Sequence, residues 1–330
     1  MLKEAKYNCS KFIKGQNKGH YESFFLRANH PLEPLAFWIR YTVFNPTNNP
    51  NKAIGELWAI FFNGNTNNHI SVKTEVPISK CNFNNNSFNI NVEHAILNAS
   101  IIKGESSSGG NKIEWDMSYK GTEDPIYLLP NKFYDMSFPK AKALVGLPFA
   151  SFNGCLLINK KKIDIQNWIG SQNHNWGSQH TDKYAWGQVA GFDNSANSFL
   201  EIATAQIKLG SVYSPKMTIA VIRHQGIEYS FNSLIRSIIN KANYNYFEWT
   251  FALNNGNEKL TGVITAKKQS FVGLNYYNPP GGNKTCLNTK IAFAEINLTL
   301  KCGRQIELKT DNRAAFEILT NDSTHNVPIN

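Results

Sequence analysis

The clearest signal in this sequence is a pair of stretches, Gly170-Ser-Gln-Asn-His-Asn-Trp-Gly177 and Tyr184-Ala-Trp-Gly-Gln-Val-Ala-Gly-Phe-Asp193, which a short polar turn joins. They place aromatic residues and a run of amides between glycines, in a chain otherwise patterned as β-sheet. Small-molecule sites are mostly apolar and aromatic with a few placed polar groups, so Trp176, Trp186 and Gln188 suit an apolar ligand. The alternative is a β core, which often buries Trp, although core packing has no use for the Asn-His-Asn run.

The composition is that of a globular protein with two domains or one large β domain. The chain has 330 residues, of which 42% are hydrophobic and 12% aromatic, enough to bury a sizeable core. No run approaches the roughly 18 apolar residues that a membrane-spanning helix needs. The segment from Met1 to Cys9 lacks the apolar stretch of a secretory signal, so we expect a cytoplasmic protein.

The net charge of +10 is spread along the chain, and its densest run is 160–162. No nucleic-acid-binding motif accompanies these lysines, so we expect no nucleic-acid partner. A diffuse positive field also favours an anionic membrane surface. Peripheral membrane association is therefore an alternative location for the protein.

The sequence shows no motif of metal, cofactor or nucleophile chemistry. Its five cysteines include no CxxC pair and are expected to be small core residues rather than disulfide partners or zinc ligands. GxGxxG, the phosphate-binding loop, GxSxG and HExxH do not occur. We therefore expect no metal site and no cofactor.

Period-two hydrophobic patterning predicts an all-β chain. Aromatic and β-branched runs at 24–27, 36–44 and 55–62 are bounded by clusters of Asn, Pro and Gly, as strands are. In the second run Arg40 shares a face with Trp38, and the other face is apolar, so the strand is expected to be covered on both sides. Such a strand suits the wall of a barrel whose interior holds a ligand.

An internal echo suggests that the chain contains two similar units. Three landmarks recur in the same order: an aromatic-Trp strand (36–45 and 184–193), a Glu-Trp strand (113–116 and 247–250) and an Ala-Phe-rich strand (147–155 and 290–296). Their spacing is domain-sized, far above the roughly 20–50 residues of solenoid repeats. We predict two β-barrels, residues 1–165 and 166–330.

Four short motifs carry a resemblance to a known group of proteins: Gly19-His-Tyr-Glu-Ser-Phe-Phe-Leu-Arg-Ala28, Phe37-Trp-Ile-Arg-Tyr41, His174-Asn-Trp-Gly177 and Tyr184-Ala-Trp-Gly-Gln188. With them the chain resembles the two-domain lipocalin-like (calycin) proteins of the AttH type. That group includes the carotenoid 1,2-hydratases (hydroxyneurosporene synthases). More distantly, tocopherol cyclases and some fungal Diels–Alderases share the tandem-barrel design.

The resemblance implies two barrels side by side, an apolar ligand in or between them, and chemistry without a metal or an organic cofactor. A hydratase of this group protonates a terminal isoprenoid double bond and adds water to the cation, whereas a cyclase traps the cation with a phenol oxygen. Both need an acid in an apolar pocket and aromatic faces that stabilise positive charge. Trp176, Trp186 and Tyr184 would supply those faces.

The sequence departs from the hydratase pattern at the acid. Hydratases have Asp-His-Asn-Trp where this chain has Asn173-His-Asn-Trp176, and an amide cannot supply the proton. The candidate replacements are Glu201, His174, Asp182, Asp193 at the end of a strand and Glu22 in the first motif. Glu201 lies in the apolar run 199–205, where burial would raise its pKa; His174 carries an imidazole, which titrates near neutral pH; and Asp182 lies in the turn. The alternatives are an outward-facing strand position for Glu201 and a solvated turn for Asp182.

Further residues are predicted to contact the ligand. Glu22 is expected either to act as an acid or to form an ion pair with Arg27 or Arg40 across the barrel mouth. The predicted ligand contacts are Asn173, Asn175, Trp176, Tyr184, Trp186, Gln188, Glu22, Trp38 and Arg40.

The leading hypothesis is a protein that binds a hydrophobic small molecule, such as an isoprenoid, a polyene or a polyketide. It would catalyse cofactor-independent cyclisation, hydration or isomerisation, or act as a carrier that needs no acid. A pericyclic catalyst would only have to orient its substrate. The alternatives from other classes are a membrane-surface or interaction protein and a carbohydrate-binding β-sandwich.

Overall fold

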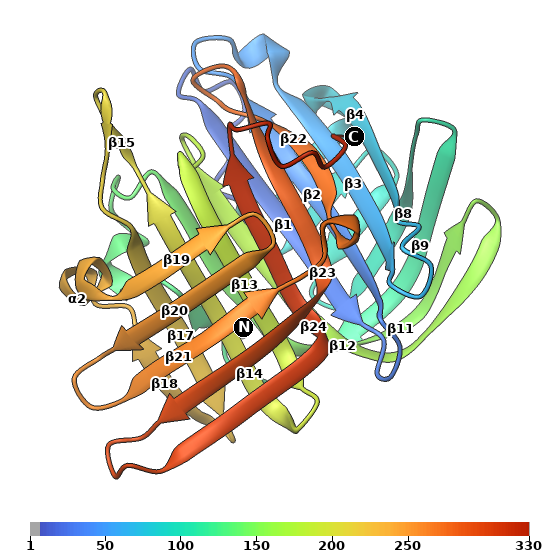
Figure 1. The fold of residues 1–330 in the computed structure, drawn as a ribbon. Coiled ribbons are helices and arrows are strands. Elements are labelled where there is room, and N and C mark those ends of the chain that lie inside the picture. Colours follow the sequence, from blue (N-terminus) through green and yellow to red (C-terminus); the bar gives the residue numbers. More distant parts are fainter. Residues whose placement is uncertain (1–6, 330) are drawn as a thin grey trace.

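The computed structural model describes residues 7–329 and consists almost entirely of antiparallel β-strands (Figure 1). Two large sheets follow one another along the chain, and each curls into a barrel-like unit. The predicted all-β fold with two barrels in tandem is confirmed. Helix α2 (Leu234–Ile239) is a short α-helix in the second half of the chain.

The first sheet has twelve strands in the order β4-β3-β2-β1-β12-β11-β9-β8-β7-β6-β5, with β10 beside β11. Thr74 Oγ1 of β4 lies 3.0 Å from Ser106 Oγ of β8, so the sheet nearly closes on itself. Its strands are β1 (His20–Asn29), β2 (Leu35–Asn45), β3 (Ile54–Asn63), β4 (Ile70–Pro77), β5 (Cys81–Phe83), β6 (Asn89–Val92), β7 (Ala95–Asn98), β8 (Ile101–Ser108), β9 (Asn111–Lys120), β10 (Ile126–Tyr127), β11 (Ala141–Ile158) and β12 (Lys161–Gly177).

The second sheet has ten strands in the order β18-β17-β14-β13-β24-β23-β21-β20-β19, with β22 beside β23. A separate two-stranded hairpin, β15 (Lys208–Leu209) and β16 (Val212–Tyr213), projects from it (Figure 1). The other strands are β13 (Lys183–Phe192), β14 (Ser195–Gln206), β17 (Met217–His224), β18 (Ile227–Phe231), β19 (Lys241–Asn245), β20 (Glu248–Asn254), β21 (Lys259–Thr265), β22 (Val272–Tyr277), β23 (Asn283–Thr299) and β24 (Gln305–Thr320).

The two sheets repeat one strand order, which agrees with the sequence echo for β11 and β23 but not for its other two pairs. In each, a four-stranded meander joins a long pair, β11–β12 or β23–β24, through its first strand. This makes β13 the counterpart of β1 and β20 the counterpart of β8, whereas the echo paired β13 with β2 and β20 with β9. The change of sheet lies between Gly177 and Lys183. The predicted boundary after residue 165 thus falls inside β12, and the division into two domains stays a prediction.

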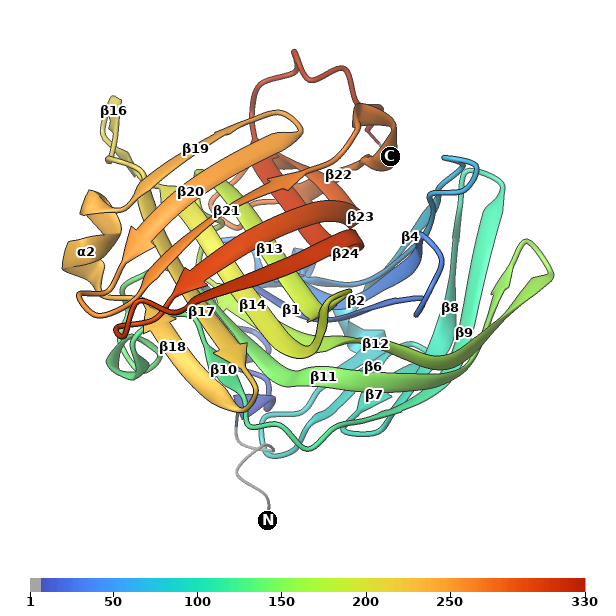
Figure 2. The same ribbon diagram turned by 60° about the horizontal axis from the view of Figure 1, so that its bottom comes forward.

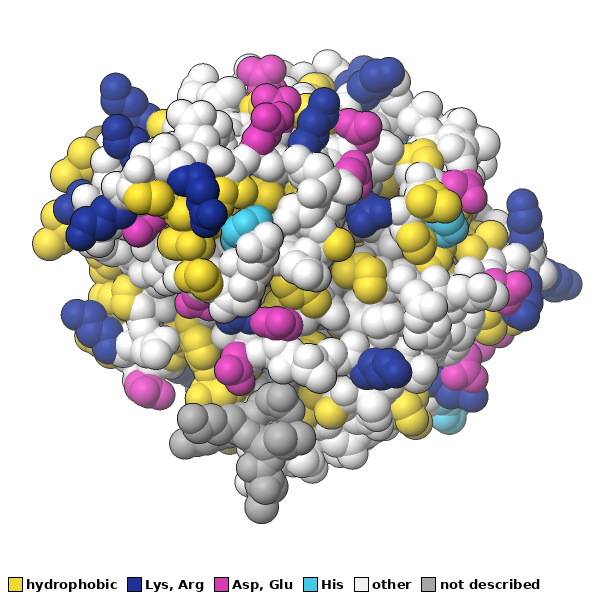
Figure 3. All heavy atoms as spheres, turned by 90° about the horizontal axis from the view of Figure 1, so that it is seen from below, with side chains coloured by type: hydrophobic (Ala, Val, Ile, Leu, Met, Phe, Trp, Pro, Cys, Tyr) yellow, Lys and Arg dark blue, Asp and Glu magenta, His cyan; other side chains and the backbone are white. Residues whose placement is uncertain are grey.

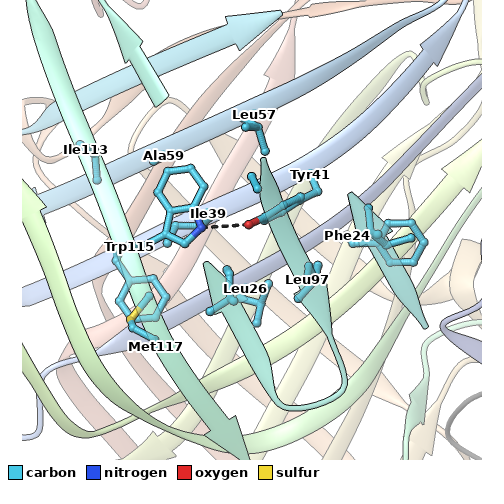
Figure 4. Packing of buried hydrophobic residues seen from close by; sticks show 14 of the residues in the cluster. Phe24, Leu26, Ile39, Tyr41, Leu57, Ala59, Leu97, Ile113, Trp115 and Met117 are labelled. Carbon is cyan, nitrogen blue, oxygen red and sulfur yellow. Dashed lines mark hydrogen bonds between the residues drawn. The ribbon is translucent and has the colours of Figure 1, made fainter. Parts of the chain in front are cut away.

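Side chains fill the interior of the first barrel. Phe37, Ile39 and Tyr41 of β2 are buried there, and Figure 4 shows Ile39 and Tyr41 among inward-pointing residues of neighbouring strands. Trp115 Nε1 donates a hydrogen bond to the Tyr41 hydroxyl over 2.9 Å. Because β2 is also buried on its opposite face, the predicted cover on both sides is confirmed. The barrel interior is packed, however, and the cavity described below lies between the barrels.

The two barrels lie side by side and share an apolar interface (Figure 2). Trp38 and Phe25 of the first sheet pack with Trp186 and Tyr276 of the second. The rings of Phe25 and Trp186 meet edge to face at 5.9 Å, and the Arg40 guanidinium lies 4.3 Å above the Tyr276 ring. The strands at this interface therefore bury one face inside a barrel and the other against the neighbouring sheet.

Gly170 in β12 marks a close backbone approach between β12 and β1. A Cβ atom at this position would lie 1.7 Å from Arg27 O and 2.6 Å from Ala28 Cα. Because these are backbone atoms of a central strand, we expect Gly170→Ala to lower the free energy of unfolding by at least about 3 kcal/mol, measured by urea titration. Gly110→Ala is the control: its φ is +79° with open space around it, so it should cost only about 1–2 kcal/mol. Equal losses would contradict the steric argument.

Candidate functional site

A cavity of about 380 Å³ lies between the two barrels. Strands β1, β2, β11 and β12 form one wall, strands β13, β14, β17, β22 and β24 the other, and the segment 128–139 and α2 complete it. Its volume falls within the roughly 300–1,000 Å³ of small-molecule sites. Six aromatic side chains of the strands line it: Tyr21, Phe25, Trp38, Tyr184, Trp186 and Tyr276.

Glu201 of β14 is a buried carboxyl group in the wall of this cavity. It lies opposite Gln188 of β13 in the strand pairing. Trp186 Nε1 donates to Glu201 Oε1 over 2.7 Å, and Gln188 Nε2 donates to Oε2 over 2.8 Å. Burial raises the pKa of Glu201 to about 7, although these hydrogen bonds and the charge of Arg27 act in the opposite direction. The group therefore exchanges its proton near neutral pH inside an apolar wall.

Gln188 is held in one amide orientation by two donors. Its Oε1 accepts hydrogen bonds from Arg27 Nε over 2.8 Å and from Ser171 Oγ over 2.7 Å. The amide nitrogen therefore faces Asn173 Oδ1, at 2.7 Å, and Glu201. Burial lowers the pKa of Arg27 to about 9, against the raising effect of the Glu201 charge. Through this amide the guanidinium of the first barrel stabilises the ionised carboxylate of the second.

A second carboxyl group in the wall, Glu317 of β24, was missed by the sequence analysis. Lys290 Nζ lies 2.7 Å from Glu317 Oε1, and Asn288 Nδ2 donates to the same oxygen over 3.1 Å. Burial lowers the pKa of Lys290, and the Glu317 charge opposes this. Glu317 stands in the apolar run Ala314-Ala-Phe-Glu-Ile-Leu319. The pattern that pointed to Glu201 would have found it too.

Glu22 lies outside this cavity and points into the first barrel, on the opposite face of β1 from Tyr21. Burial alone would raise its pKa, but the hydrogen bonds and charges of two histidine rings hold the pKa of Glu22 well below its usual range. The predicted ion pair with Arg27 or Arg40 is not formed, because both arginines point to the interface. The carboxylate accepts hydrogen bonds from His174 Nε2 (2.8 Å), His20 Nε2 (3.2 Å), Ser10 Oγ (2.7 Å), Lys11 N (2.7 Å) and Phe12 N (3.0 Å).

His174 contributes to the cavity wall, but its ring is turned toward Glu22. Its second nitrogen, Nδ1, lies 2.9 Å from Tyr7 O, so both ring nitrogens are engaged. The Trp176 ring packs 4.6 Å from the His174 ring and 5.9 Å from the Tyr134 ring and is not in the wall. The structure therefore separates His174 and Trp176 from the predicted acid Glu201.

The remaining predicted residues fall into two groups. Asp182 lies outside the wall: its Oδ2 accepts a hydrogen bond from Lys208 N over 2.8 Å, and Lys284 Nζ lies 3.4 Å from Oδ1. The cavity wall brings together Asn173, Asn175, Tyr184, Trp186, Trp38, Arg40 and Glu201, while Gln188 stands directly behind it. In this wall Trp38 Nε1 and Asn175 Oδ1 have no hydrogen-bond partner among residues 7–329. Both atoms are buried away from solvent.

Residues 7–329 contain no cluster of three or more His, Cys, Asp or Glu side chains placed to hold a metal ion. In the same part of the chain, no helix combines the length and the apolar character needed to cross a bilayer.

No family model matches the sequence. Two curated, uncharacterised proteins from strains of Mycobacterium tuberculosis are 22% identical to it over 204 residues, which is 62% of this chain and 61% of theirs. The match thus spans about six-tenths of those relatives.

Solved structures match over nearly the whole chain. The AttH-type protein of Nitrosomonas europaea has a TM-score of 0.58 at 10% identity, covering 94% of this chain and 96% of that one. Kievitone hydratase from Nectria haematococca has a TM-score of 0.59 at 12% identity, covering 98% and 97%. CghA has a TM-score of 0.51 at 8% identity, covering 94% and 93%. The chain therefore has the lipocalin-like two-barrel fold of the AttH-type structures, as its sequence motifs predicted.

Proposed function

We propose that this protein is an acid catalyst that binds an apolar, unsaturated small molecule between its barrels and protonates it with Glu201. The observation that carries the proposal is the position of this carboxyl group. It is buried in the wall of an aromatic cavity, and its pKa of about 7 leaves it substantially protonated at neutral pH.

The geometry around Glu201 suits proton donation to the cavity. A carboxyl oxygen has two lone pairs, and each oxygen of Glu201 accepts one hydrogen bond, from Trp186 or from Gln188. Each oxygen keeps a lone pair that can carry the acidic proton. After the proton has left, the same two donors stabilise the carboxylate, so the site favours both states of the reaction.

The reaction begins when the Glu201 O–H bond breaks and a C–H bond forms at one carbon of a ligand double bond. The neighbouring carbon becomes a cation, and the electrons of the O–H bond remain on the carboxylate. Water then adds to the cation and returns a proton to Glu201, which is hydration; an internal hydroxyl that adds instead gives cyclisation. Trp38 and Trp186 in the wall have aromatic rings, which favour positive charge, and the Lys290 ammonium already lies 5.7 and 5.4 Å from their centres.

The comparison supports this proposal in one respect. Kievitone hydratase, by its name a hydratase, has the same fold over 98% of this chain.

Two measurements test the proposal. Native mass spectrometry of the purified protein should detect a bound apolar molecule, either carried from the host or taken from a panel of isoprenoids and polyenes. Incubation of the bound molecule with the protein in D₂O should then place deuterium on one of its carbons. Binding without deuterium uptake would make the protein a carrier and overturn the catalytic role. Absence of both would overturn the cavity as a binding site.

A further inference from the structure

Three segments expose large apolar side chains at one end of the second barrel. They are the loop 134–139, the hairpin of β15 and β16, and helix α2, which together are called the apolar rim. Ile235 and Ile239 of α2 are 79% and 73% exposed, and Leu209 and Val212 of the hairpin are 61% and 62% exposed. Large apolar side chains that gather on an exposed surface often mark a binding site.

The apolar rim surrounds the entrance of the cavity between the barrels. Phe138, Leu234 and Ile238 belong to the rim and also line the cavity, as does Ile207 at the base of the hairpin. Figures 1 and 2 both show α2 and the hairpin at the same outer edge of the second barrel, with the hairpin projecting beyond it. The exposed surface and the apolar interior are therefore continuous.

Positive charge accompanies the apolar rim. Residues 131–140, 206–216 and 233–241 contain six Lys or Arg and a single acidic residue, Asp135. On the face seen in Figure 3, hydrophobic side chains gather at the left edge with Lys and Arg around them. The Lys183 ammonium lies 4.4 Å from the centre of the Tyr213 ring in the hairpin. Exposed apolar side chains with Lys and Arg beside them are typical of surfaces that bind at the membrane interface.

We propose that the apolar rim docks this protein on an anionic lipid bilayer and opens the cavity toward the hydrocarbon. Apolar side chains that project from the edge of the barrel can insert into a bilayer, and the anionic headgroups attract the surrounding lysines. A second copy of the chain fits less well, because a two-fold dimer places the same basic surface on both partners. The proposal goes beyond the proposed function and does not depend on Glu201: it concerns how an apolar ligand enters.

The test is flotation of the whole chain with vesicles of phosphatidylcholine and phosphatidylglycerol in equal amounts. We expect binding in about 0.1 M NaCl, at least about tenfold weaker binding to vesicles of phosphatidylcholine alone, and weaker binding in about 0.5 M NaCl. The variant Ile235→Ser/Ile239→Ser should bind at least about tenfold more weakly. Both side chains are mostly exposed, so the fold should be retained, which circular dichroism checks.

The matched control is Ile13→Ser/Ile101→Ser, which replaces two exposed isoleucines of the first barrel region and should bind like the wild type. Equal binding of both double variants would overturn the proposal, as would no binding to anionic vesicles at low salt. A dimer in light scattering that only Ile235→Ser/Ile239→Ser abolishes would overturn it in favour of self-association. None of these outcomes depends on whether the free protein binds a ligand. The proposal that a ligand binds in the cavity is therefore tested separately.

Discussion

Glu201→Gln is expected to lower turnover of the ligand about a thousandfold while the ligand still binds. An amide cannot give up the proton that the reaction needs, yet it has the shape of the carboxyl group it replaces. The cavity wall around position 201, with Trp186 and Tyr184, is retained. We therefore expect the loss in kcat, with a dissociation constant within about threefold of the wild type.

The variant also changes the hydrogen bonds. Both neighbours, Trp186 Nε1 and Gln188 Nε2, donate to Glu201, so the amide nitrogen of Glu201→Gln faces a donor and one bond is lost. The lost hydrogen bond should lower the free energy of unfolding by about 1 kcal/mol. A loss of that size cannot account for a thousandfold loss of turnover. The exposed Glu295→Gln on β23 is the control and should behave as wild type. Unchanged turnover in Glu201→Gln would remove Glu201 from the mechanism.

The pH dependence gives an independent check on the same residue. Because the acid form is the active one and its pKa is about 7, kcat/KM should fall about tenfold for each pH unit above that value. The folded pKa also lies above the ordinary value of 4.5. The stability that Glu201 contributes is therefore fully present below pH 4.5 and is lost as the pH rises through about 7. Relative to Glu201→Gln, the wild type should lose about 3 kcal/mol of unfolding free energy over that interval.

The fold and the acid could be predicted because both leave a local trace in the sequence. Alternating aromatic and β-branched residues show as strands wherever one face is buried, and Glu201 is conspicuous as a charge in an apolar run. Glu317 leaves the same trace, although none of the motifs that carry the resemblance lies near it in the sequence. The position of the cavity leaves no such local trace in the sequence, because it depends on which face of β2 meets the second barrel.

The roles of His174 and Glu22 could not be predicted, because they depend on which face of a strand each residue occupies. Glu22 was expected beside an arginine, yet the alternation of β1 places it inside the barrel and Arg27 outside. His174 follows it inside because Phe24 pairs with His174 in the register of β1 and β12. A shift of one residue in either strand would have brought the imidazole to the cavity.

Glu22→Ala is expected to lower the free energy of unfolding by about 4 kcal/mol or more. The carboxylate is fully buried and accepts hydrogen bonds from two histidines and from the segment Ser10–Phe12. Removing it leaves these donors without an acceptor in the barrel interior, and each buried polar group left unsatisfied costs about 1–3 kcal/mol. Urea titration followed by tryptophan fluorescence measures the change.

The matched control is Glu105→Ala. This carboxylate is exposed and pairs with Lys112 over 3.1 Å, a surface ion pair whose loss should stay below about 1 kcal/mol. Glu22→Gln should fall between the two, because its amide keeps one acceptor oxygen but turns a donor toward other donors. The segment that Glu22 holds should also become accessible, so trypsin should cleave after Lys11 faster in Glu22→Ala than in Glu105→Ala.

The pH at which the difference disappears identifies the carboxylate as its source. The folded pKa of Glu22 lies well below its ordinary value of 4.5, so the stability it contributes is present above pH 4.5 and is lost as the pH falls toward the folded pKa. The gap between wild type and Glu22→Ala should therefore shrink below pH 4.5, opposite to the behaviour of Glu201. A gap that stays constant down to acid unfolding would mean that packing, not the charge, holds the N-terminal segment to the barrel.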